Sequence, residues 1–328
     1  MNKVVLSTAA LLCGALVMAQ ENRSQIEQYN DDHVALVTQV GELNRSSVYQ
    51  NYGDGSTSII SQGGTSNSSI VNQFQDGHLA VVTQVGNSNR SDVHQNGATN
   101  VGTVFQTGNR NFVDIEQVGI TNEATAVQGV LIFGSYDGTV WQKQTGEYNI
   151  ADATMLNSSN YVNQRQDGRY NLATSEQNLG LFDFGGSNEA RQVQDGAGND
   201  AQIIQEQSFN VAGQFQEGDD NVAFSFQSGD FNSVLQEQFG DLNDAAATQY
   251  GDYNTVLQYQ NGSGNLADSF QDGDYNTSDI WQAGTGNMAF DVQVGSFNST
   301  LVTQIGASHL STVAQTGASN IAIVSQGN

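Results

Sequence analysis

The residues best placed for specific chemistry are glutamines that recur every 11 residues through the second half of the chain. A carboxamide carries both donors and an acceptor, so identical side chains stacked from one repeat to the next can hydrogen-bond to one another. A fixed short period indicates one small structural unit repeated many times. The spacing therefore predicts a ladder of amides rather than a reacting centre. Its glutamines are Gln194, Gln205, Gln216, Gln227, Gln238, Gln249, Gln260, Gln271, Gln282, Gln293, Gln304, Gln315 and Gln326.

Glycine and asparagine follow most of these glutamines at fixed distances, Gly two residues later and Asn five residues later. The asparagines are expected to form a second structural ladder, and the glycines are expected to lie in turns. The ladder asparagines are Asn199, Asn210, Asn221, Asn232, Asn243, Asn254, Asn265, Asn276, Asn287 and Asn298. The turn glycines are Gly218, Gly229, Gly240, Gly251, Gly262 and Gly273.

The parity of the spacing separates strand from turn. Asn232 and Gln238 are six positions apart, so their side chains share one face of an extended strand. Gln238 and Asn243 are five positions apart with Gly240 between them, and a strand cannot keep its register across that interval. The unit is therefore predicted as a strand of seven residues, from Asn to Gln, followed by a turn of four in which Gly supplies a positive φ.

Applied from Asn22 onward, this unit predicts 27 strands. The closing position is Gln in every strand but one, where Met155 stands, and the opening position is usually Asn. Two insertions, near 129–140 and 178–188, interrupt the pattern and are expected to bulge from the corners as loops. Histidine replaces the opening Asn in three strands, where we interpret it as a polar substitute for the ladder amide rather than a metal ligand. These residues are His33, His78 and His309.

The face shared by Asn and Gln is predicted to point inward. It carries small or branched residues such as Ala212 and Val234, and Asp291 is its only charge. The opposite face carries many charges, which are costly to bury without a partner. At the third inward position Gln alternates with Ser or Ala, which adds a period of 22 and indicates two strands and two turns in each rung.

These patterns predict an all-β fold, a β-solenoid of about 13 stacked two-strand rungs of 22 residues, each built from two 11-residue half-repeats. Eleven residues is also three turns of a helix. The helical alternative is disfavoured because the inward pattern has a period of two, Gly recurs in most units, and Leu, Lys and Arg are scarce.

Composition narrows the function further. The chain has 34 acidic and 9 basic residues and a net charge of -25, which argues against nucleic-acid binding. It contains no Pro, as expected of a chain that is nearly all hydrogen-bonded strand. No Ser/His/acid set, phosphate loop or Cys/His cluster is found, so no catalytic residue, metal or cofactor is predicted and the chain is not expected to be an enzyme.

Acidic residues recur in the predicted corners, as at Asp219 and Asp230. We interpret them as charges that slow the premature association of strand-forming segments. A calcium site is the alternative, but the Gly-Gly-x-Gly-x-Asp motif of calcium-binding β-rolls is absent.

Residues 1–19 have the features of a secretory signal peptide. Lys3 precedes an apolar run, and Ala19 closes a plausible cleavage site. The run is too short for a membrane-spanning helix. Cys13, the only cysteine, lies in this leader, so the secreted solenoid, residues 20–328, is expected to contain no disulfide.

The repeated pattern Gln-x-Gly-x-x-Asn-x-Ala-x-x-x-Gln resembles the curlin repeat of the subunits of curli, the bacterial functional amyloid fibres. It stands unbroken at 117–128, 216–227 and 260–271. The resemblance implies secretion of an unfolded chain through a curli-type outer-membrane pore and nucleation at the cell surface by a curlin-like minor subunit. It further implies growth into extracellular fibres that serve adhesion and biofilm formation, without enzyme activity.

The ends of the predicted solenoid point independently to polymerisation. A solenoid ends in two rungs with unpaired backbone groups, which monomeric proteins usually cover with a cap. No cap is evident beside the first strand, from Asn22, or the last, from Asn320 to Gln326, so head-to-tail self-association is expected.

Three alternatives remain at this point: a monomeric secreted adhesin, an ice-binding solenoid, and a carbohydrate-processing β-helix enzyme. The outward face also carries aromatic residues, which either bundle filaments or stack on neighbouring rungs. These are Phe224, Phe226, Tyr259, Phe270 and Trp281.

Overall fold

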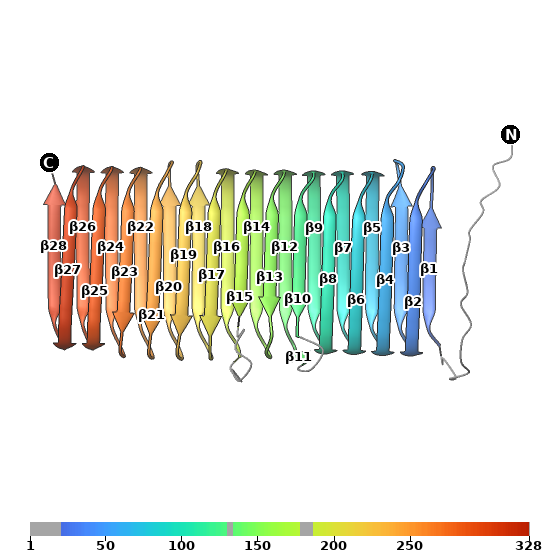
Figure 1. Cartoon of the computed structure of the whole chain (residues 1–328), viewed down its shortest axis with the longest axis horizontal. Coiled ribbons are helices and arrows are strands. Elements are labelled where there is room, and N and C mark those ends of the chain that lie inside the picture. The colour runs from blue at the N-terminus through green and yellow to red at the C-terminus, as the bar shows by residue number, and fades with distance from the viewer. Residues whose placement is uncertain (1–20, 130–133, 178–185, 328) are drawn as a thin grey trace.

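The computed structural model describes residues 21–129, 134–177 and 186–327, which form 28 β-strands stacked in two parallel sheets (Figure 1). The first sheet contains β1 (Arg23–Gln28), β3 (Arg45–Asn51), β5 (Ser68–Asp76), β7 (Arg90–Ala98), β9 (Phe112–Ile120), β12 (Thr139–Glu147), β14 (Tyr161–Arg169), β16 (Glu189–Ala197), β18 (Val211–Glu217), β20 (Ser233–Phe239), β22 (Thr255–Ser263), β24 (Thr277–Thr285), β26 (Ser299–Ala307) and β28 (Ile321–Gly327). The second sheet contains β2 (Val34–Glu42), β4 (Thr57–Thr65), β6 (Leu79–Asn87), β8 (Val101–Asn109), β10 (Glu123–Gln128), β13 (Ile150–Met155), β15 (Leu172–Gln177), β17 (Asp200–Glu206), β19 (Val222–Ser228), β21 (Asp244–Tyr250), β23 (Leu266–Asp272), β25 (Met288–Ser296) and β27 (Leu310–Ala318), with the short β11 (Ser135–Tyr136) beside β8.

Apart from β11, consecutive strands alternate between the two sheets, and each pairs in parallel with the next strand of its own sheet. The register places equivalent repeat residues side by side, as Gln238 beside Gln260. One rung thus consists of one strand from each sheet and two corners, and the chain advances by one rung every 22 residues in the regular part (Figure 1). The predicted all-β solenoid of about 13 rungs is confirmed.

The strands extend further than the sequence predicts. Many have nine residues and continue past the closing Gln, as β26 does through Gly306 to Ala307. The continuation is possible because Gly284 and Gly306 keep the parallel pairing beyond the glutamines. The predicted four-residue turn is therefore wrong in length. The sharp change of direction falls instead on the residue before each Asn, where Phe231 and Leu242 adopt a left-handed φ of 60° and 59°.

The repeat glycine is required by packing as well as by conformation. Gly240 has φ 101°, a conformation that residues with a side chain rarely adopt. A Cβ built on Gly240 would lie 2.1 Å from the carbonyl oxygen of Gly262 in the next rung. All six predicted turn glycines have a positive φ, from 96° at Gly251 to 130° at Gly262.

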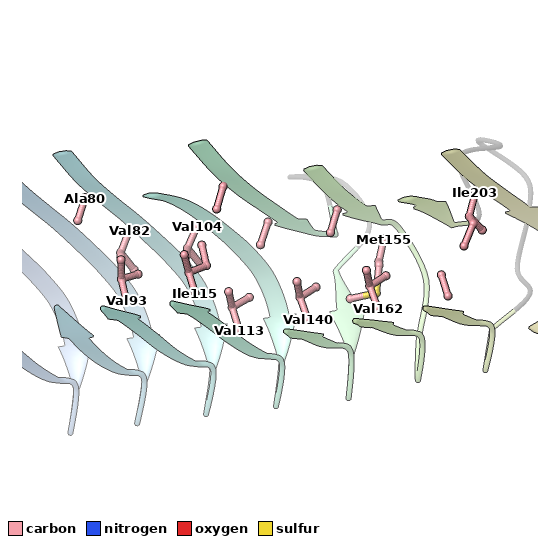
Figure 2. Packing of buried hydrophobic residues seen from close by; sticks show 14 of the residues in the cluster. Ala80, Val82, Val93, Val104, Val113, Ile115, Val140, Met155, Val162 and Ile203 are labelled. Carbon is pink, nitrogen blue, oxygen red and sulfur yellow. The ribbon is translucent and has the colours of Figure 1, made fainter. Parts of the chain in front are cut away.

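The core is a narrow strip between the sheets. Valine and isoleucine side chains such as Val82, Val93, Val104 and Ile115 meet there from opposite strands (Figure 2). The inward face is as predicted, because the ladder amides and the small apolar residues are buried and Asp291 is only 1% exposed.

The described part of the first insertion contains β11, which pairs with Gly108 and Asn109 of β8, so the expectation of loop alone is wrong there. The remaining residues of that insertion, 130–133, and residues 178–185 of the second lie outside the described residues, as does the predicted signal peptide. No helix long and apolar enough to cross a membrane is found in the described ranges.

Candidate functional site

The predicted glutamines form two continuous amide ladders, one in each sheet. In the first sheet, Gln194 Nε2 donates to Gln216 Oε1 at 2.9 Å, and the same bond repeats rung by rung to Gln326. In the second sheet, an equivalent series runs from Gln205 to Gln315 with distances of 2.9–3.2 Å. Donation always points toward the rung nearer the C-terminus, so the ladders have a direction.

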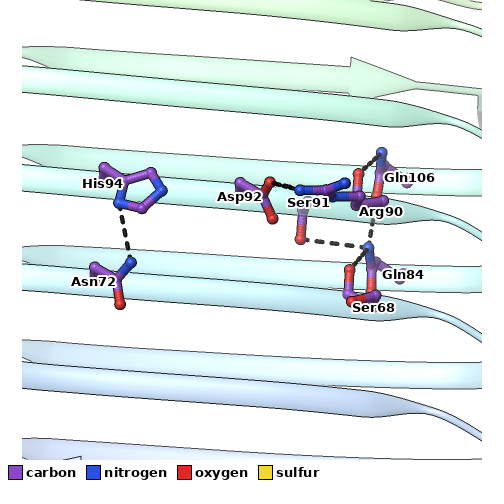
Figure 3. Close-up of polar contacts among 8 residues, drawn as sticks. All are labelled: Ser68, Asn72, Gln84, Arg90, Ser91, Asp92, His94 and Gln106. Carbon is purple, nitrogen blue, oxygen red and sulfur yellow. Dashed lines mark hydrogen bonds and ion pairs between the residues drawn. The ribbon is translucent and has the colours of Figure 1, made fainter.

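Each ladder amide also holds the two sheets together. The second hydrogen of Gln238 Nε2 goes to the backbone carbonyl of Val222, 2.8 Å away in the other sheet. The ladders extend into the N-terminal half, where Gln84 Nε2 donates to Gln106 Oε1 at 2.8 Å and to the Ser68 carbonyl at 3.0 Å (Figure 3). The glutamines from Gln194 to Gln326 therefore pair with one another while they join the sheets, as buried amides must. Met155 interrupts the second-sheet ladder nearer the N-terminus, and Gln177 Oε1 is buried there without a hydrogen-bond partner.

The asparagines form ladders at the corners, again one for each sheet. Asn221 Oδ1 accepts the backbone N–H of Asn243 at 3.0 Å and its Nδ2 at 3.1 Å. Asn221 Nδ2 donates to the carbonyl of Gly240 at 2.6 Å. The side chain thus ties its own rung to the backbone of the next at the point where the chain turns. The same backbone contact recurs through Asn199 to Asn287 and through Asn210 to Asn298.

Histidine in the asparagine position accepts the same backbone hydrogen bond from the next rung. His78 Nδ1 accepts the backbone N–H of Asn100 at 3.2 Å, while its Nε2 lies 2.7 Å from the Phe74 carbonyl. Desolvation lowers the pKa of His78, which favours the neutral ring that an accepting Nδ1 needs. His33 Nδ1 likewise accepts the N–H of Ser56 at 3.2 Å. The interpretation of His33 and His78 as ladder substitutes is confirmed.

A third glutamine ladder, which the sequence interpretation does not include, lies in the first sheet. The glutamines at the third inward position of the first sheet hydrogen-bond from rung to rung over distances of 2.8–3.0 Å. The sequence signal for this ladder is the alternation of Gln with Ser or Ala, from which only a 22-residue rung is inferred. The residues are Gln142, Gln164, Gln192, Gln214, Gln236 and Gln258.

An exposed stack of aromatic rings along one corner was also missed. Consecutive ring centroids are 4.8–5.0 Å apart and the ring planes lie within 7° of parallel. Each ring belongs to the left-handed residue before an Asn. Aromatic residues recur there every 22 positions, and this recurrence is the sequence signal for the stack. We call this the corner stack: Phe209, Phe231, Tyr253, Tyr275 and Phe297.

The outward aromatic residues on the strands contact neighbouring rings. Phe226 and Phe270 both pack against Tyr250, with ring centroids 5.4 and 6.0 Å apart. Tyr259 and Trp281 lie 4.5 Å apart, and Trp281 remains 48% exposed. Contact with rings of neighbouring rungs, one of the two uses expected from the sequence, is confirmed for Phe226, Tyr259, Phe270 and Trp281, with the ring planes tilted rather than parallel.

The acidic corner residues join the hydrogen-bond network. Asp219 N–H donates to Asp241 Oδ1 at 3.0 Å, and Asp230 N–H donates to Asp252 Oδ1 at 2.8 Å. The carboxylates thereby extend from rung to rung and accept backbone donors. Within the described ranges, no group of three or more His, Cys, Asp or Glu residues is arranged to hold a metal ion.

The outward face carries ion pairs and a shallow depression. Arg90 donates to Asp92 at 2.5 Å, and His94 lies 3.0 Å from Asn72 on the adjacent strand (Figure 3). The depression, of about 270 Å³, lies on the first sheet and is lined by residues that include Asp195. Arg90 and Asp92 belong to the same strand, β7, whereas Asn72 and His94 lie on neighbouring strands of one surface.

The inward carboxylate of Asp291 stands apart from the amides. Burial raises the pKa of this carboxyl to about 6, an effect that the hydroxyls of Ser278 and Thr300 partly oppose. Those two hydroxyls lie close to other acceptors: Thr300 Oγ1 donates to Gln315 Oε1 at 3.1 Å, and Ser278 Oγ lies 3.0 Å from Ser269 Oγ. Asp291 therefore makes the described core sensitive to pH at one position.

The two terminal rungs leave apolar side chains exposed. At one end, Leu36 on β2 is 53% exposed; at the other, Ile321 and Ile323 on β28 are 76% and 71% exposed. In the part of the chain that the structure describes, each of β1, β2, β27 and β28 has a neighbouring strand on one side only. These four strands are the candidate assembly surfaces.

Residues 86–119 match the family model of the curlin associated repeat. The matched stretch covers β7, β8 and β9, in which Gln95, Gln106 and Gln117 belong to the glutamine ladders. No curated protein matches the chain. The resemblance seen in the sequence is therefore confirmed in this stretch. A curlin repeat within a β-solenoid fits a structural protein of the curli type.

Proposed function

We propose that the protein is the structural subunit of extracellular, curli-like amyloid fibres, which grow by head-to-tail stacking of solenoids and serve surface adhesion and biofilm formation. The observation that carries the proposal is the pair of open terminal rungs. Each terminal rung contains two strands, and one edge of each strand is unpaired. Unpaired strand edges are templates for pairing with another chain. Because the two ends differ, the contact is heterologous and repeats without closing.

The direction of the amide ladders supports a polar fibre. Gln304 Nε2 donates to Gln326 Oε1 at 2.8 Å, so the next donor in the series, Gln326 Nε2, belongs to the C-terminal rung. At the other end, Gln28 Nε2 donates to Gln50 Oε1 at 2.7 Å, which leaves Gln28 Oε1 as the next acceptor. Donors at one end and acceptors at the other match only when unlike ends meet.

The test is assembly of the secreted chain, residues 20–328, after transfer from denaturant into plain buffer. Thioflavin fluorescence and electron microscopy are expected to report a lag followed by growth of unbranched fibres. A strand-rich monomer that never grows would contradict the proposal and favour a monomeric secreted adhesin or ice-binding solenoid.

A matched pair of variants at the C-terminal edge sharpens the test. Ser299 N–H donates to the Asn320 carbonyl at 2.8 Å, so the N–H of the equivalent residue one rung later, Ile321, faces the open side. Alternation along a strand gives Ile323 the same direction, and Pro removes such a donor without loss of an internal bond. Ile323→Pro is expected to remain monomeric, whereas Ile323→Val is expected to form fibres.

Two partners complete the proposal: a curlin-like nucleating subunit and a curli-type outer-membrane secretion pore. The curlin repeat supports both, since the chain would be exported before it folds. Expression in a curli-secreting bacterium that lacks its own fibre subunit should produce surface fibres. Deletion of the pore should retain the chain inside the cell.

A further inference from the structure

The number of half-repeat strands between Arg23 and Gly327 is odd. β11 aside, β1 and β28 both belong to the first sheet, which holds one more strand along the solenoid path than the second. The strand that would continue the path after β28 must lie in the second sheet, on β27. If another copy were added by translation alone, its β1 would lie on β28. One strand would then be missing from the second sheet at every junction.

We propose that successive subunits of the fibre are related by about half a turn around the solenoid axis, so that β1 of the next subunit pairs with β27 and its β2 pairs with β28. The inference rests on the proposed fibre and specifies its junction. The exchange of sheets is possible because both sheets carry the same glutamine and asparagine ladders.

The side chains of β2 and β28 match in this register. Parallel pairing aligns the residues that follow the ladder asparagine, as Ser299 aligns with Ile321. Across the junction, Leu36 would lie beside Ile323, and the next inward pair would be Val37 on Val324. Translation alone would instead place Gln25 beside Ile323, a polar side chain against an exposed apolar one.

The amide ladders would also continue through the half-turned junction. Gln315 and Gln326 donate from their Nε2 groups to backbone carbonyls at 3.2 and 2.9 Å, and each amide carries a second hydrogen. Gln28 and Gln39 donate toward their own next rungs, so their Oε1 atoms face the incoming C-terminal rung. Every junction would then add one bond to each glutamine ladder.

The asparagine ladders would continue at the same time. The backbone N–H of Asn320 is bound by Asn298 Oδ1 at 3.1 Å, so Asn320 Oδ1 is the next acceptor of that series. His309 N–H is bound by Asn287 Oδ1 at 3.1 Å, and its ring would accept the N–H of Asn22 through Nδ1. His78 already provides that bond to Asn100 inside the solenoid.

Cysteine pairs distinguish the two registers, because the secreted chain has no cysteine of its own. Stacked strands lie about 4.8 Å apart, within the Cα separation that a disulfide spans. Fibres of Leu36→Cys/Ile323→Cys are assembled under reduction and then oxidised. When these fibres are dissociated, the released species are expected to be disulfide-linked multimers. Fibres of Gln25→Cys/Ile323→Cys are expected to dissociate into monomers. Leu235→Cys/Leu257→Cys, whose residues pair inside the solenoid, provides the oxidation control.

Multimers from Gln25→Cys/Ile323→Cys would overturn the half-turn, as would fibres that give multimers from neither pair while the control oxidises. Failure of every variant and the unmodified chain to form fibres would overturn the fibre proposal itself. A second variant reverses the prediction: deletion of 22–32 removes β1 and leaves an even number of strands. In its fibres, β2 of the next subunit should pair with β27, which places Leu36 beside Thr312. The disulfide of Leu36→Cys/Ile323→Cys should therefore be lost, and Leu36→Cys/Thr312→Cys should form one instead. Persistence of the original disulfide would contradict the parity argument.

Discussion

Gln238 donates through Nε2 to Oε1 of Gln260, 2.9 Å away in the next rung, and both side chains are completely buried. The contact joins equivalent residues of successive repeats, so the loss of one side chain affects the rungs on both sides. The glutamine ladder is therefore a chain of dependent bonds rather than a set of separate pairs.

Gln238→Ala should destabilise the fold. It leaves Gln216 without its acceptor, leaves Gln260 Oε1 without its donor, and opens a cavity. Each unsatisfied buried group costs about 1–3 kcal/mol. Urea unfolding of the Ile323→Pro background measures the loss. Gln202→Ala, on the outward face of β17, is the control and should change stability by less than about 0.5 kcal/mol.

Gly240→Ala should prevent close stacking at its corner. The new Cβ would lie 2.1 Å from the Gly262 carbonyl oxygen, so the backbone must shift, and φ 101° adds strain. We expect a loss of more than about 3 kcal/mol in unfolding free energy, or failure to assemble. Gly264→Ala is the control, because φ is 64° and no atom lies within 4 Å; it should cost only about 1–2 kcal/mol. Equal effects of the two substitutions would contradict the steric argument.

Asp291 should make stability depend on pH. Its pKa is about 6 in the folded state and near 4 in an unfolded chain, so the folded state binds more protons between these values. Stability should therefore rise as pH falls from about 7 toward 4 and decrease as pH rises through 6. Asp291→Asn should weaken this dependence and stabilise the fold at pH 7.5 by on the order of 2 kcal/mol. Part of the dependence should remain, because burial also raises the pKa of outward carboxyls such as Asp152 and Asp244.

Urea midpoints between pH 4.5 and 7.5 measure the effect of Asp291. Asp272→Asn, at an exposed position on the same sheet, is the matched control and should keep the pH dependence of the unmodified chain. If Asp291→Asn retains that dependence in full, the titrating group lies elsewhere.

The corner stack should contribute to stability through ring contacts alone. Tyr253 lies between Phe231 and Tyr275, with centroids 4.9 and 4.8 Å away. Tyr253→Ala removes two stacked pairs, each worth about 0.5–1.5 kcal/mol, so a loss of roughly 1–3 kcal/mol is expected in urea unfolding. Tyr253→Phe keeps both rings in contact and should be neutral. A comparable loss in the Phe variant would assign the effect to the hydroxyl instead.

Much of the fold follows from the sequence because the strands are parallel and in register. In such a stack, the neighbour of each residue is its own equivalent one rung away, as Gln238 is the neighbour of Gln260. The period alone therefore determines which side chains meet along a sheet. The inward face follows from the cost of burying charge, since Asp291 is the only charged residue on it.

The tertiary structure alone decided the contacts between the sheets and at the corners. The second hydrogen bond of Gln238 goes to the carbonyl of Val222, 16 positions earlier, an interval that is not a multiple of 11. The 22-residue period aligns the rings of the corner stack, but only the left-handed conformation of the residue before each Asn shows that they lie at a corner. The continuation of the strands through Gly306 also depends on how closely the rungs stack. Periodicity specifies neighbours along the solenoid axis, whereas contacts across the rung depend on how the backbone turns at each corner, and the period carries no information about that turn.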